Sequence, residues 1–378
     1  KTVGVGNYTK ATLLSLIKHS DDIKLRVFAE DLNGKEEYVE NKIKVERFWK
    51  RGSLLSQFKL FIKAAKQPEK IIFLPFETYM FGGLFSVITM LPMMFYLRLK
   101  GKKTILVLHQ VLGGDIAIFE KNKLKVLILS SIRALFYKLM LVASAKVVVF
   151  EEEFKQRLGS ADKVEVIPHA VIQEIVINKD VAKDKLGLDK NKHYIFYFGF
   201  LSPYKGVEEL LDIWEGLDNI ELIIGGGSNP NHMNKPDYKR FVDGVMKKAQ
   251  EKGVQTTGFI PEEQMKEYFS AVDVVVLPYT VFMSSSGPLS HAFSYGNGVL
   301  LSDPLRGYFN SRDMKRALDE SDISIEEICF SLDRSIRNKV LWAIHNISKL
   351  KEFSHRMCQI RSWDVIGEEY IKVIRDLK

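Results

Sequence analysis

Short apolar runs alternate with helix-length segments along the first half of the chain. The apolar runs read IKLRVF, KIIFLPF, KTILVLH, AKVVVF and KVEVIPH. Segments with the length and composition of helices occur at 8–19, 82–100 and 123–142. Buried strands separated by helices are typical of βαβ units, which build parallel sheets. We therefore expect a doubly wound parallel sheet in this half.

The second half repeats the same alternation. Its strand candidates read HYIFYFG, IELIIGGG, GVQTTGF, AVDVVVLPY and GVLLSD. The chain of 378 residues, 46% of them hydrophobic, is long enough for two such α/β domains. We place the boundary after VIPHAV, which predicts domains at 1–172 and 173–362 and a terminal helix at 363–378. Ligands of such sheets bind at the carboxyl ends of the strands.

Cysteine content and the amino-terminal residues add two expectations. Two well-separated cysteines, Cys329 and Cys358, exclude a disulfide framework and a Cys-type zinc site, which fits a reducing compartment. The sequence has no signal peptide, and it opens on a glycine loop without an initiator methionine. We therefore expect that the first strand of the first domain is missing upstream.

The charge is unevenly distributed. The net charge of +8 divides into 25 Lys and Arg against 12 Asp and Glu in residues 1–150, and 30 against 35 in the remainder. A basic half can meet nucleic acid, an anionic membrane or an acidic substrate. No zinc finger or aromatic RNP strand accompanies it, so we do not expect nucleic acid as a partner.

Two loops in the second half are suited to an anion. The stretch MSSSGPLSHAFSYGNG follows a predicted strand, and Pro288 fits the first helical position, so the N–H groups of Ser285 to Gly287 would face outward at the positive end of a helix. An ordinary capped helix is the alternative. In FGFLSPYKG, Lys205 follows another strand end and can neutralise a phosphate. Together they suggest a diphosphate held between a cation and backbone donors.

These motifs resemble retaining GT-B glycosyltransferases of family 4. The specific part is FGFLSPYKG, VIPHAV, TTGFIPEEQMKEYFSAVDVVVLPY and SSSGPLSHAFSYGNGVLLSD. Upstream, GVGNYTKATLLSL resembles their glycine loop and first helix, VLHQVLGG the segment with an active-site histidine, and SWDVIGEEYIKVIRDL the helix that crosses back to the first domain. The resemblance implies two Rossmann-like domains facing a cleft, the first binding the acceptor and the second the nucleotide sugar.

The resemblance also implies an activity. A hexose would pass from a nucleotide-diphosphate sugar to a lipid-linked or glycan acceptor, with retention of configuration and without a metal or cofactor. The leaving diphosphate would be stabilised by N–H groups and one lysine. No DxD pair follows a strand end, which agrees with a metal-independent reaction.

Particular positions inherit roles from the resemblance. His109 and Lys205 are the catalytic candidates, His109 as a contact to the donor sugar. The donor-binding candidates are Gly4, Gly6, Phe200, Lys205, Phe259, Ile260, Met283, Ser284, Ser285, Ser286, Gly287, Pro288, Leu289 and His291. Three positions depart from the family: Met283 and His291 replace paired glutamates, and Phe200 replaces an arginine. We interpret them as features of a serine-glycine variant of the family.

Other interpretations remain open. His109 and His169 could be structural residues. The glycines of IIGGGSN do not form a complete dinucleotide fingerprint, and no ribose-binding acid follows, which argues against a dehydrogenase. The lost glutamates favour an alternative in which the protein binds a nucleotide sugar without transferring it, as an epimerase or a regulatory subunit.

The first half also predicts a membrane surface as partner. Between Glu77 and Arg98 lie 20 residues without a charge, a length close to that of a spanning helix. Spanning would break the sheet around it, and Pro92 interrupts the run. The segment 121–142 mixes Lys121, Lys123, Lys125, Arg133 and Lys138 with large apolar residues. We expect a cytoplasmic protein, peripheral on the inner face of the cell membrane; a homodimer contact or an unusually deep core is the alternative.

Overall fold

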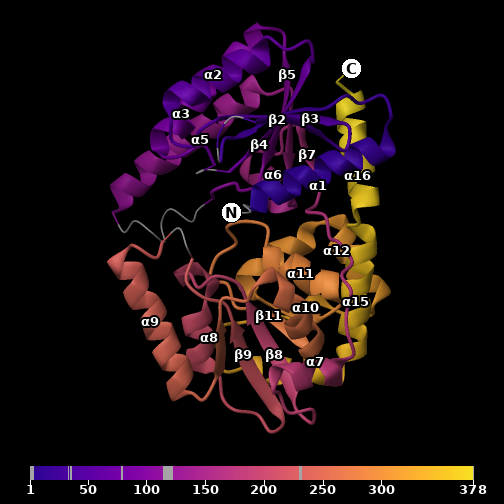
Figure 1. Ribbon diagram of the computed structural model, residues 1–378. Helices are drawn as coiled ribbons and strands as arrows, with labels where there is room; N and C mark the ends of the chain where they lie inside the picture. Colours follow the sequence, from indigo (N-terminus) through magenta and orange to yellow (C-terminus); the bar gives the residue numbers. More distant parts are fainter. Residues whose placement is uncertain are drawn as a thin grey trace. The chain divides into compact units, whose positions relative to one another are not determined.

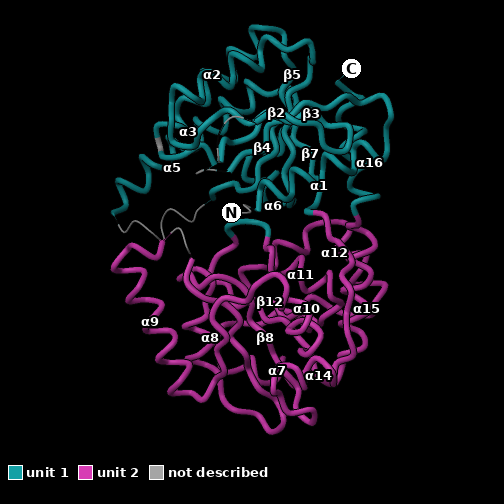
Figure 2. The backbone as a smooth tube through the Cα atoms, in the orientation of Figure 1, with its two compact units in different colours: residues 1–169, 283–285, 363–378 teal, residues 170–282, 286–362 magenta. Residues whose placement is uncertain are grey.

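The computed structural model describes residues 4–32, 34, 36–77, 80–113, 122–229 and 232–377. Of the predicted segments, Thr78, Tyr79, Gly114 and Lys121 lie outside the described residues. The chain divides into two compact units (Figure 2). Unit 1 comprises 1–169, 283–285 and 363–378, and unit 2 comprises 170–282 and 286–362. We describe each unit by itself.

A four-stranded parallel sheet forms the centre of unit 1. Its order is β4-β5-β6-β7, with β4 at Ile71–Phe76, β5 at Lys103–Leu108, β6 at Lys146–Val149 and β7 at Val164–Val166. Crossovers contain α3 (Leu84–Leu99), α5 (Lys123–Ala143) and the short α6 (Glu152–Arg157) (Figure 1). The side chains of β5 from Ile105 to Leu108 are completely buried, as expected for a strand covered on both faces.

Unit 1 contains a second, three-stranded sheet that the apolar pattern only partly predicts. Its order is β1-β3-β2, with β1 at Arg26–Glu30, β2 at Glu36–Glu40 and β3 at Ile43–Trp49. β1 runs parallel to β3, whereas β2 and β3 form an antiparallel hairpin. Asn41 and Lys42, at its tip, have φ angles of 49° and 65°, which a tight hairpin turn requires. The charges of EEYVE and IKVERFW hide these two strands from a search for apolar runs.

Strands β1 and β4 are edge strands of their two sheets. Between them lies a groove of about 270 Å³, bordered on the β1 side by the segment 22–25 and on the β4 side by 69–73. Side chains of α1 (Gly4–His19) and of α16 (Trp363–Arg375) also line this groove. Each sheet therefore presents one edge to the same apolar groove.

The final helix of the chain packs within unit 1. The Ser15 hydroxyl of α1 donates to the Trp363 carbonyl at 2.7 Å, and the Tyr8 and Tyr370 hydroxyls share a hydrogen bond of 3.2 Å. Gly367 allows close approach, because a Cβ there would lie 1.9 Å from Ser15 Oγ. Helix α2, also in this unit, spans Leu54–Ala65 and begins with a side-chain cap from Ser53.

Unit 2 contains a six-stranded, wholly parallel sheet. Its order is β10-β9-β8-β11-β12-β13. The strands are β8 His193–Phe198, β9 Ile220–Gly225, β10 Gln255–Gly258, β11 Val274–Leu277, β12 Gly298–Ser302 and β13 Cys329–Phe330. The first five match predicted strands, whereas β13 is only two residues long and gives no apolar run. The central strands β11 and β12 are buried along their whole length.

Helices surround this sheet. They are α7 Lys179–Leu186, α8 Val207–Ile213, α9 Pro236–Glu251, α10 Glu262–Ala271, α11 Gly287–Tyr295, α12 Arg312–Glu320, α13 Ile325–Ile328, α14 Ile336–His345 and α15 Ile347–Ile360, with 3-10 turns η1 Pro203–Lys205 and η2 Asp303–Asn310. Helix α15 packs against α11, α12 and β12. The topology brings the ends of β8, β10 and β11 to one edge of the sheet, where the predicted anion-binding loops lie.

Candidate functional site

The turn after β8 fixes the position of Lys205. Gly199 ends the strand with a φ of 131°, and a Cβ at this position would lie 2.8 Å from Lys205 Nζ and 3.3 Å from Pro288 Cγ. Gly206 follows Lys205 with a φ of 67°, and a Cβ there would lie 1.7 Å from the Pro278 carbonyl oxygen. Both positions therefore require glycine. The amine of Lys205 and the first turn of α11 consequently converge beside Gly199.

Lys205 lies in an environment that disfavours its charge. Removal from solvent lowers the pKa of this amine, and the ring of Tyr279 lies 5.5 Å from Nζ. Among the described residues, no carboxylate forms an ion pair with Lys205. A bound anion would favour the charged amine and would offset the cost of its desolvation.

Helix α11 begins one residue earlier than predicted: Gly287 is its first residue, and Pro288, which we expected at the first position, is its second. Ser286 is the N-cap: its hydroxyl oxygen accepts from the N–H of Leu289 at 3.3 Å and shares a hydrogen bond of 3.1 Å with the Tyr279 hydroxyl. Pro288 occupies the first turn. Gly287 is exposed, and a Cβ there would meet no atom within 4 Å. The space in front of this helix end is therefore open to a ligand.

An aromatic pair lies at the carboxyl ends of β8 and β10. The rings of Phe200 and Phe259 are stacked, with centroids 6.3 Å apart and an interplanar angle of 14°. Phe259 is 65% exposed, whereas the neighbouring Ile260 is buried. An exposed aromatic face of this kind can stack with a planar ring such as a nucleobase.

The glycine run after β9 serves backbone packing. A Cβ at Gly226 would lie 1.9 Å from the Gly199 carbonyl oxygen, and one at Gly227 would lie 3.0 Å from the Phe259 nitrogen. These glycines let the loops after β8, β9 and β10 approach each other closely. The glycines of IIGGGSN, which do not form a complete dinucleotide fingerprint, are therefore explained by this close packing of the backbone.

His291 packs among aromatic rings on the second turn of α11. Its ring lies 5.8 Å from that of Phe198 at 90° and 5.9 Å from that of Phe269. Burial lowers the pKa of this histidine to about 4, so it is neutral near pH 7. The structure therefore places the predicted donor contact in a packed, uncharged setting, next to Leu289, which is buried in the core.

In unit 1, His109 follows β5 and belongs to an aromatic cluster. Its ring lies 5.3 Å from Tyr8 and 4.9 Å from Phe150, and Tyr8 lies 4.6 Å from the ring of His169. Burial, with a smaller effect of His169, lowers the pKa of His109 to about 3. Within the described residues its Nε2 atom is buried without a hydrogen-bond partner. A neutral imidazole with an unused ring nitrogen can bind a hydroxyl.

The short segment 283–285 belongs to unit 1 and is held by two contacts. Ser284 forms a β-bridge with Gln110, next to His109, and the Ser285 hydroxyl donates to Glu151 Oε1 at 2.9 Å. Met283 and Ser284 are half-buried. The hydroxyl of Ser285 thus binds Glu151, whereas the predicted anion contact of this residue concerns its backbone N–H.

Glu151 is a buried residue of this region that sequence reasoning missed. It follows β6 at the start of the acidic run EEE, and it is only 1% exposed. A carboxylate directly after a buried parallel strand was the available signal. Gly4 and Gly6, in contrast, lie within the first turns of α1, both exposed, and a Cβ at either would meet no atom within 4 Å.

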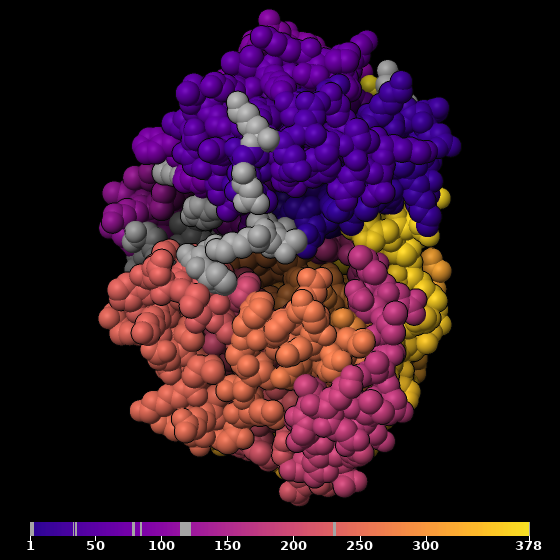
Figure 3. Space-filling view, viewed as in Figure 1, coloured from indigo at the N-terminus to yellow at the C-terminus, as the bar shows by residue number. Residues whose placement is uncertain are grey.

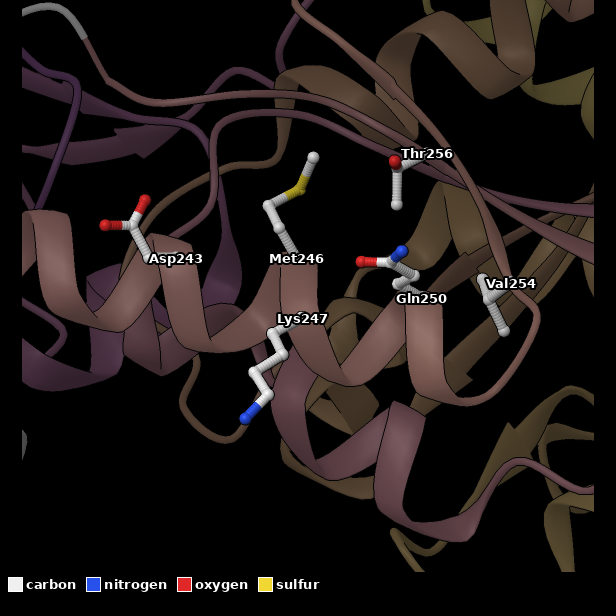
Figure 4. A pocket seen from close by; sticks show the side chains of 6 residues that line it. All are labelled: Asp243, Met246, Lys247, Gln250, Val254 and Thr256. Carbon is white, nitrogen blue, oxygen red and sulfur yellow. The ribbon is translucent and has the colours of Figure 1, made fainter.

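A separate hollow of about 480 Å³ lies on unit 2 between α9 and β10 (Figure 4). Its lining residues are Asp243, Met246, Lys247, Gln250, Val254 and Thr256. No predicted site residue borders it. Among the residues described by the structure, no group of three His, Cys, Asp or Glu could hold a metal ion. The convergent chemistry of unit 2 is therefore at the β8, β10 and β11 strand ends.

Comparison with known proteins identifies the segment that carries this site. Residues 178–302 match the family model described as glycosyl transferases group 1. A GDP-mannose:glycolipid 4-beta-D-mannosyltransferase from Xanthomonas campestris pv. campestris is 32% identical over 107 residues. That match spans 28% of this chain and 29% of the length of the relative. The matched part of unit 2 contains Lys205 and the start of α11.

Solved structures resemble the whole chain. Sucrose-phosphate synthase from Thermosynechococcus elongatus has a TM-score of 0.72 at 17% identity and covers 100% of this chain and 94% of its own. Anabaena HepE in complex with UDP and glucose has a TM-score of 0.68 at 13% identity, with coverage of 99% and 96%. The lipopolysaccharide glycosyltransferase WaaG has a TM-score of 0.60 at 12% identity, with coverage of 99% and 96%.

These likenesses confirm the predicted fold class. The chain is an α/β protein with two Rossmann-like domains and has the GT-B fold, and residues 178–302 of its second unit are similar to group 1 glycosyl transferases.

Proposed function

We propose that this protein is a glycosyltransferase that moves a hexose from a nucleotide-diphosphate sugar to a lipid-linked or glycan acceptor. The observation that carries the proposal is the convergence of Lys205 and the first turn of α11 beside Gly199. This pair lies within the segment that matches group 1 glycosyl transferases. A lysine and backbone N–H groups around open space suit a diphosphate.

The reaction breaks the bond between the anomeric carbon and the diphosphate oxygen and forms a bond from that carbon to the acceptor oxygen. Negative charge develops on the departing nucleoside diphosphate. The N–H group of Gly287 at the start of α11 and the Lys205 amine, which lies beside Gly199 close to Pro288, would stabilise that charge. The departing phosphate takes the proton of the acceptor hydroxyl, so no carboxylate pair is needed.

The remaining candidates divide into two groups. Phe200 and Phe259 supply a stacking surface for the base of the nucleotide, with Ile260 packed behind it. His109 contributes its free Nε2 to a hydroxyl of the donor sugar. Gly4, Gly6 and the segment 283–285, which belong to unit 1, remain donor-binding candidates on the resemblance to GT-B glycosyltransferases.

The first test is a panel of nucleotide sugars, read by thermal shift and by release of nucleoside diphosphate. A donor at about a hundred times its dissociation constant should stabilise the protein by about 2.7 kcal/mol. Lys205→Ala should lower the rate of release by about 100- to 1000-fold, the usual cost of one electrostatic donor at a developing anion. A chelator should leave the wild-type rate unchanged.

Lys247→Ala is the matched control, because Lys247 is an exposed lysine of the hollow on α9. It should keep the wild-type rate. Equal rates for the Lys205 and Lys247 variants would remove Lys205 from the site.

We also propose that configuration is retained. The relative from Xanthomonas forms, by its name, a β-mannoside from GDP-mannose, so the anomeric outcome needs a direct measurement. The proton NMR spectrum of the first-formed product distinguishes the α from the β linkage. An inverted product would overturn retention while leaving glycosyl transfer in place.

A second candidate function is binding of a nucleotide sugar without transfer, by an epimerase or a regulatory subunit. The observation that favours it is the absence of carboxylates at Met283 and His291, where His291 is packed between Phe198 and Phe269. The same donor panel separates the two. Bound donor that stays intact or is epimerised would support this candidate; released nucleoside diphosphate with a glycosylated acceptor would exclude it.

A further inference from the structure

Three helices of unit 1 expose apolar side chains outward. Helix α3 packs against both α2 and α5 (Figure 1). On α5 most of the exposed apolar residues recur at helical spacing along one face, with exposed fractions from 45% to 66%: Leu124, Leu127, Ile128, Ile132, Leu135 and Val142, whereas Leu129 lies off this face. The opposite face holds the buried Tyr137 and Met140. Helix α5 therefore has an apolar face on each side.

The neighbouring helices extend this surface. On α3, Phe85 is 75% exposed, Ile88 52% and Leu99 86%. On α2, Leu55 and Ile62 are exposed as well. We call the exposed residues of α2, α3 and α5 the docking face; they contribute to the purple surface of unit 1 in Figure 3. Single exposed apolar residues are common in soluble proteins, but their recurrence on three helices that pack in a row indicates a surface with a partner.

The topology argues that α5 lies along a surface and does not cross a membrane. Of the helices in the described part of the chain, only α5, with 21 residues, is long and apolar enough to span. It connects β5 to β6, however, and these are neighbouring parallel strands of one sheet. Both ends of α5 must therefore return to the same folded unit.

The charge of the three helices indicates which kind of partner the docking face binds. Within their bounds, α2, α3 and α5 contain seven Lys and Arg and no Asp or Glu. Lys59, Lys123, Lys125 and Lys138 are exposed. Basic residues around large apolar side chains are the composition of helices that lie in an anionic lipid interface.

We propose that the docking face binds an anionic membrane surface, with the apolar side chains in the headgroup region and the lysines at the lipid phosphates. A second copy of the chain fits less well. In a two-fold dimer this face would meet itself, and its lysines would face lysines with no carboxylates from these helices to pair them.

If the docking face binds the membrane, the acceptor is lipid-linked and reaches the protein at the membrane surface. This statement about the acceptor rests on the proposed function. Binding of the docking face to lipid requires no nucleotide sugar. A failure of vesicle binding and a failure of glycosyl transfer are therefore separate results.

The test is co-sedimentation of the full chain with sucrose-loaded vesicles, either of neutral phosphatidylcholine alone or with one third phosphatidylglycerol. We expect binding to the anionic vesicles at least tenfold tighter than to neutral ones, and weaker as salt is raised from 0.05 to 0.5 M. Leu127→Gln with Leu135→Gln, and separately Lys123→Glu with Lys138→Glu, should each lower the affinity tenfold or more. These side chains are exposed, so both variants should fold, which thermal unfolding checks.

Matched controls lie on unit 2. Ile175→Gln removes an apolar side chain that is 78% exposed, and Lys247→Glu with Lys252→Glu reverses two exposed lysines. Neither should change vesicle binding. Absence of binding by the folded wild type, or equal losses in docking-face and control variants, would overturn the proposal. A dimer in sedimentation velocity that Leu127→Gln with Leu135→Gln dissociates, without vesicle binding, would assign the face to a second copy.

Discussion

Lys205 illustrates how one side chain can reveal a ligand. Its side chain is half-buried, desolvation lowers the pKa of its amine, and among the described residues no carboxylate pairs with it. Leaving a cation in such a place costs stability unless something compensates. Glycines at 199 and 206 maintain the arrangement, because any Cβ there would collide with it. The cost is understandable if a diphosphate supplies the missing negative charge.

Gly287→Val tests the helix-end part of the site. The added side chain would extend into space where a Cβ meets no atom within 4 Å, so folding should be unaffected. It should block close approach of phosphate to the backbone of α11 and lower donor affinity at least tenfold. Isothermal titration with the donor found in the panel measures this.

Gly244→Val is the matched control, because Gly244 lies on α9 and a Cβ there also meets nothing within 4 Å. It should keep donor affinity. If Gly287→Val binds donor as tightly as this control, the diphosphate lies elsewhere.

At the residue scale, the sequence predicts backbone features that depend on residues close by in the chain. The turn around Lys205 and the helix after Gly206 follow from local patterns and match the prediction, and the start of α11 is predicted to within one residue. The partner of the Ser285 hydroxyl could not be predicted, because Glu151 lies 134 positions away. The aromatic surroundings of His291 likewise arise only when β8 and α10 pack against α11.

At the scale of elements, the burial of a strand determines whether it can be predicted from an apolar run in the sequence. β5, β11 and β12 are fully covered and read as continuous apolar runs. β2 carries three glutamates in five residues and is largely exposed, so its pattern resembles that of a loop. Such strands are defined by pairing with β3, which a search for apolar runs does not detect.

The turn between β8 and α8 gives a prediction for this scale. Gly206→Ala would place a Cβ 1.7 Å from the Pro278 carbonyl oxygen, so the backbone of the β8 or β11 loop must move. We expect a loss of about 2–4 kcal/mol in the free energy of unfolding, from strain and overpacking together. Nucleoside diphosphate release should fall too, because Lys205 would be displaced. Urea unfolding and the release assay measure the two effects.

Gly253→Ala separates the steric effect from the conformational one. Gly253 has a φ of 66°, against 67° at Gly206, but a Cβ there meets nothing within 4 Å. The control should lose only about 1 kcal/mol, the cost of a left-handed residue other than glycine, and keep its activity. Equal losses in the two variants would contradict the close approach to Pro278.

At the scale of the whole molecule, each unit contains a histidine that burial keeps neutral. The pKa is lowered from an ordinary 6.5 to about 3 at His109 in unit 1 and to about 4 at His291 in unit 2. The unfolded chain therefore binds more protons below pH 6.5, and stability falls as the pH falls toward the folded values. Between pH 7 and pH 5 each histidine should remove about 2 kcal/mol from the free energy of unfolding.

Urea unfolding at the two pH values checks this. The double variant His109→Asn, His291→Asn should lose most of the difference between pH 7 and pH 5. His345→Asn, at an exposed histidine of α14, should retain it. A double variant with undiminished acid sensitivity would show that other groups cause it.

The alternation of strands and helices predicts the fold class of the molecule, because that rhythm is repeated twice along the chain. It does not predict how the chain is shared between the units. The segment 283–285 belongs to unit 1 although the residues on both sides of it belong to unit 2. Only three residues are involved, and the contacts that decide their place, to Gln110 and Glu151, come from distant segments.

The packing of α16 on α1 has a consequence for the order in which the protein matures on the ribosome. Tyr370 is completely buried in unit 1, against Tyr8 and Phe73. The ribosome reaches α16 only after it has made all of unit 2, about 10 to 40 seconds after residue 169 at about 5 to 20 residues per second. Domains usually mature in the order of their synthesis, but here the unit begun first is finished last. During that interval the apolar side chains of α1 and β4 that α16 later buries remain exposed. We therefore expect chaperones to bind the nascent chain of this protein.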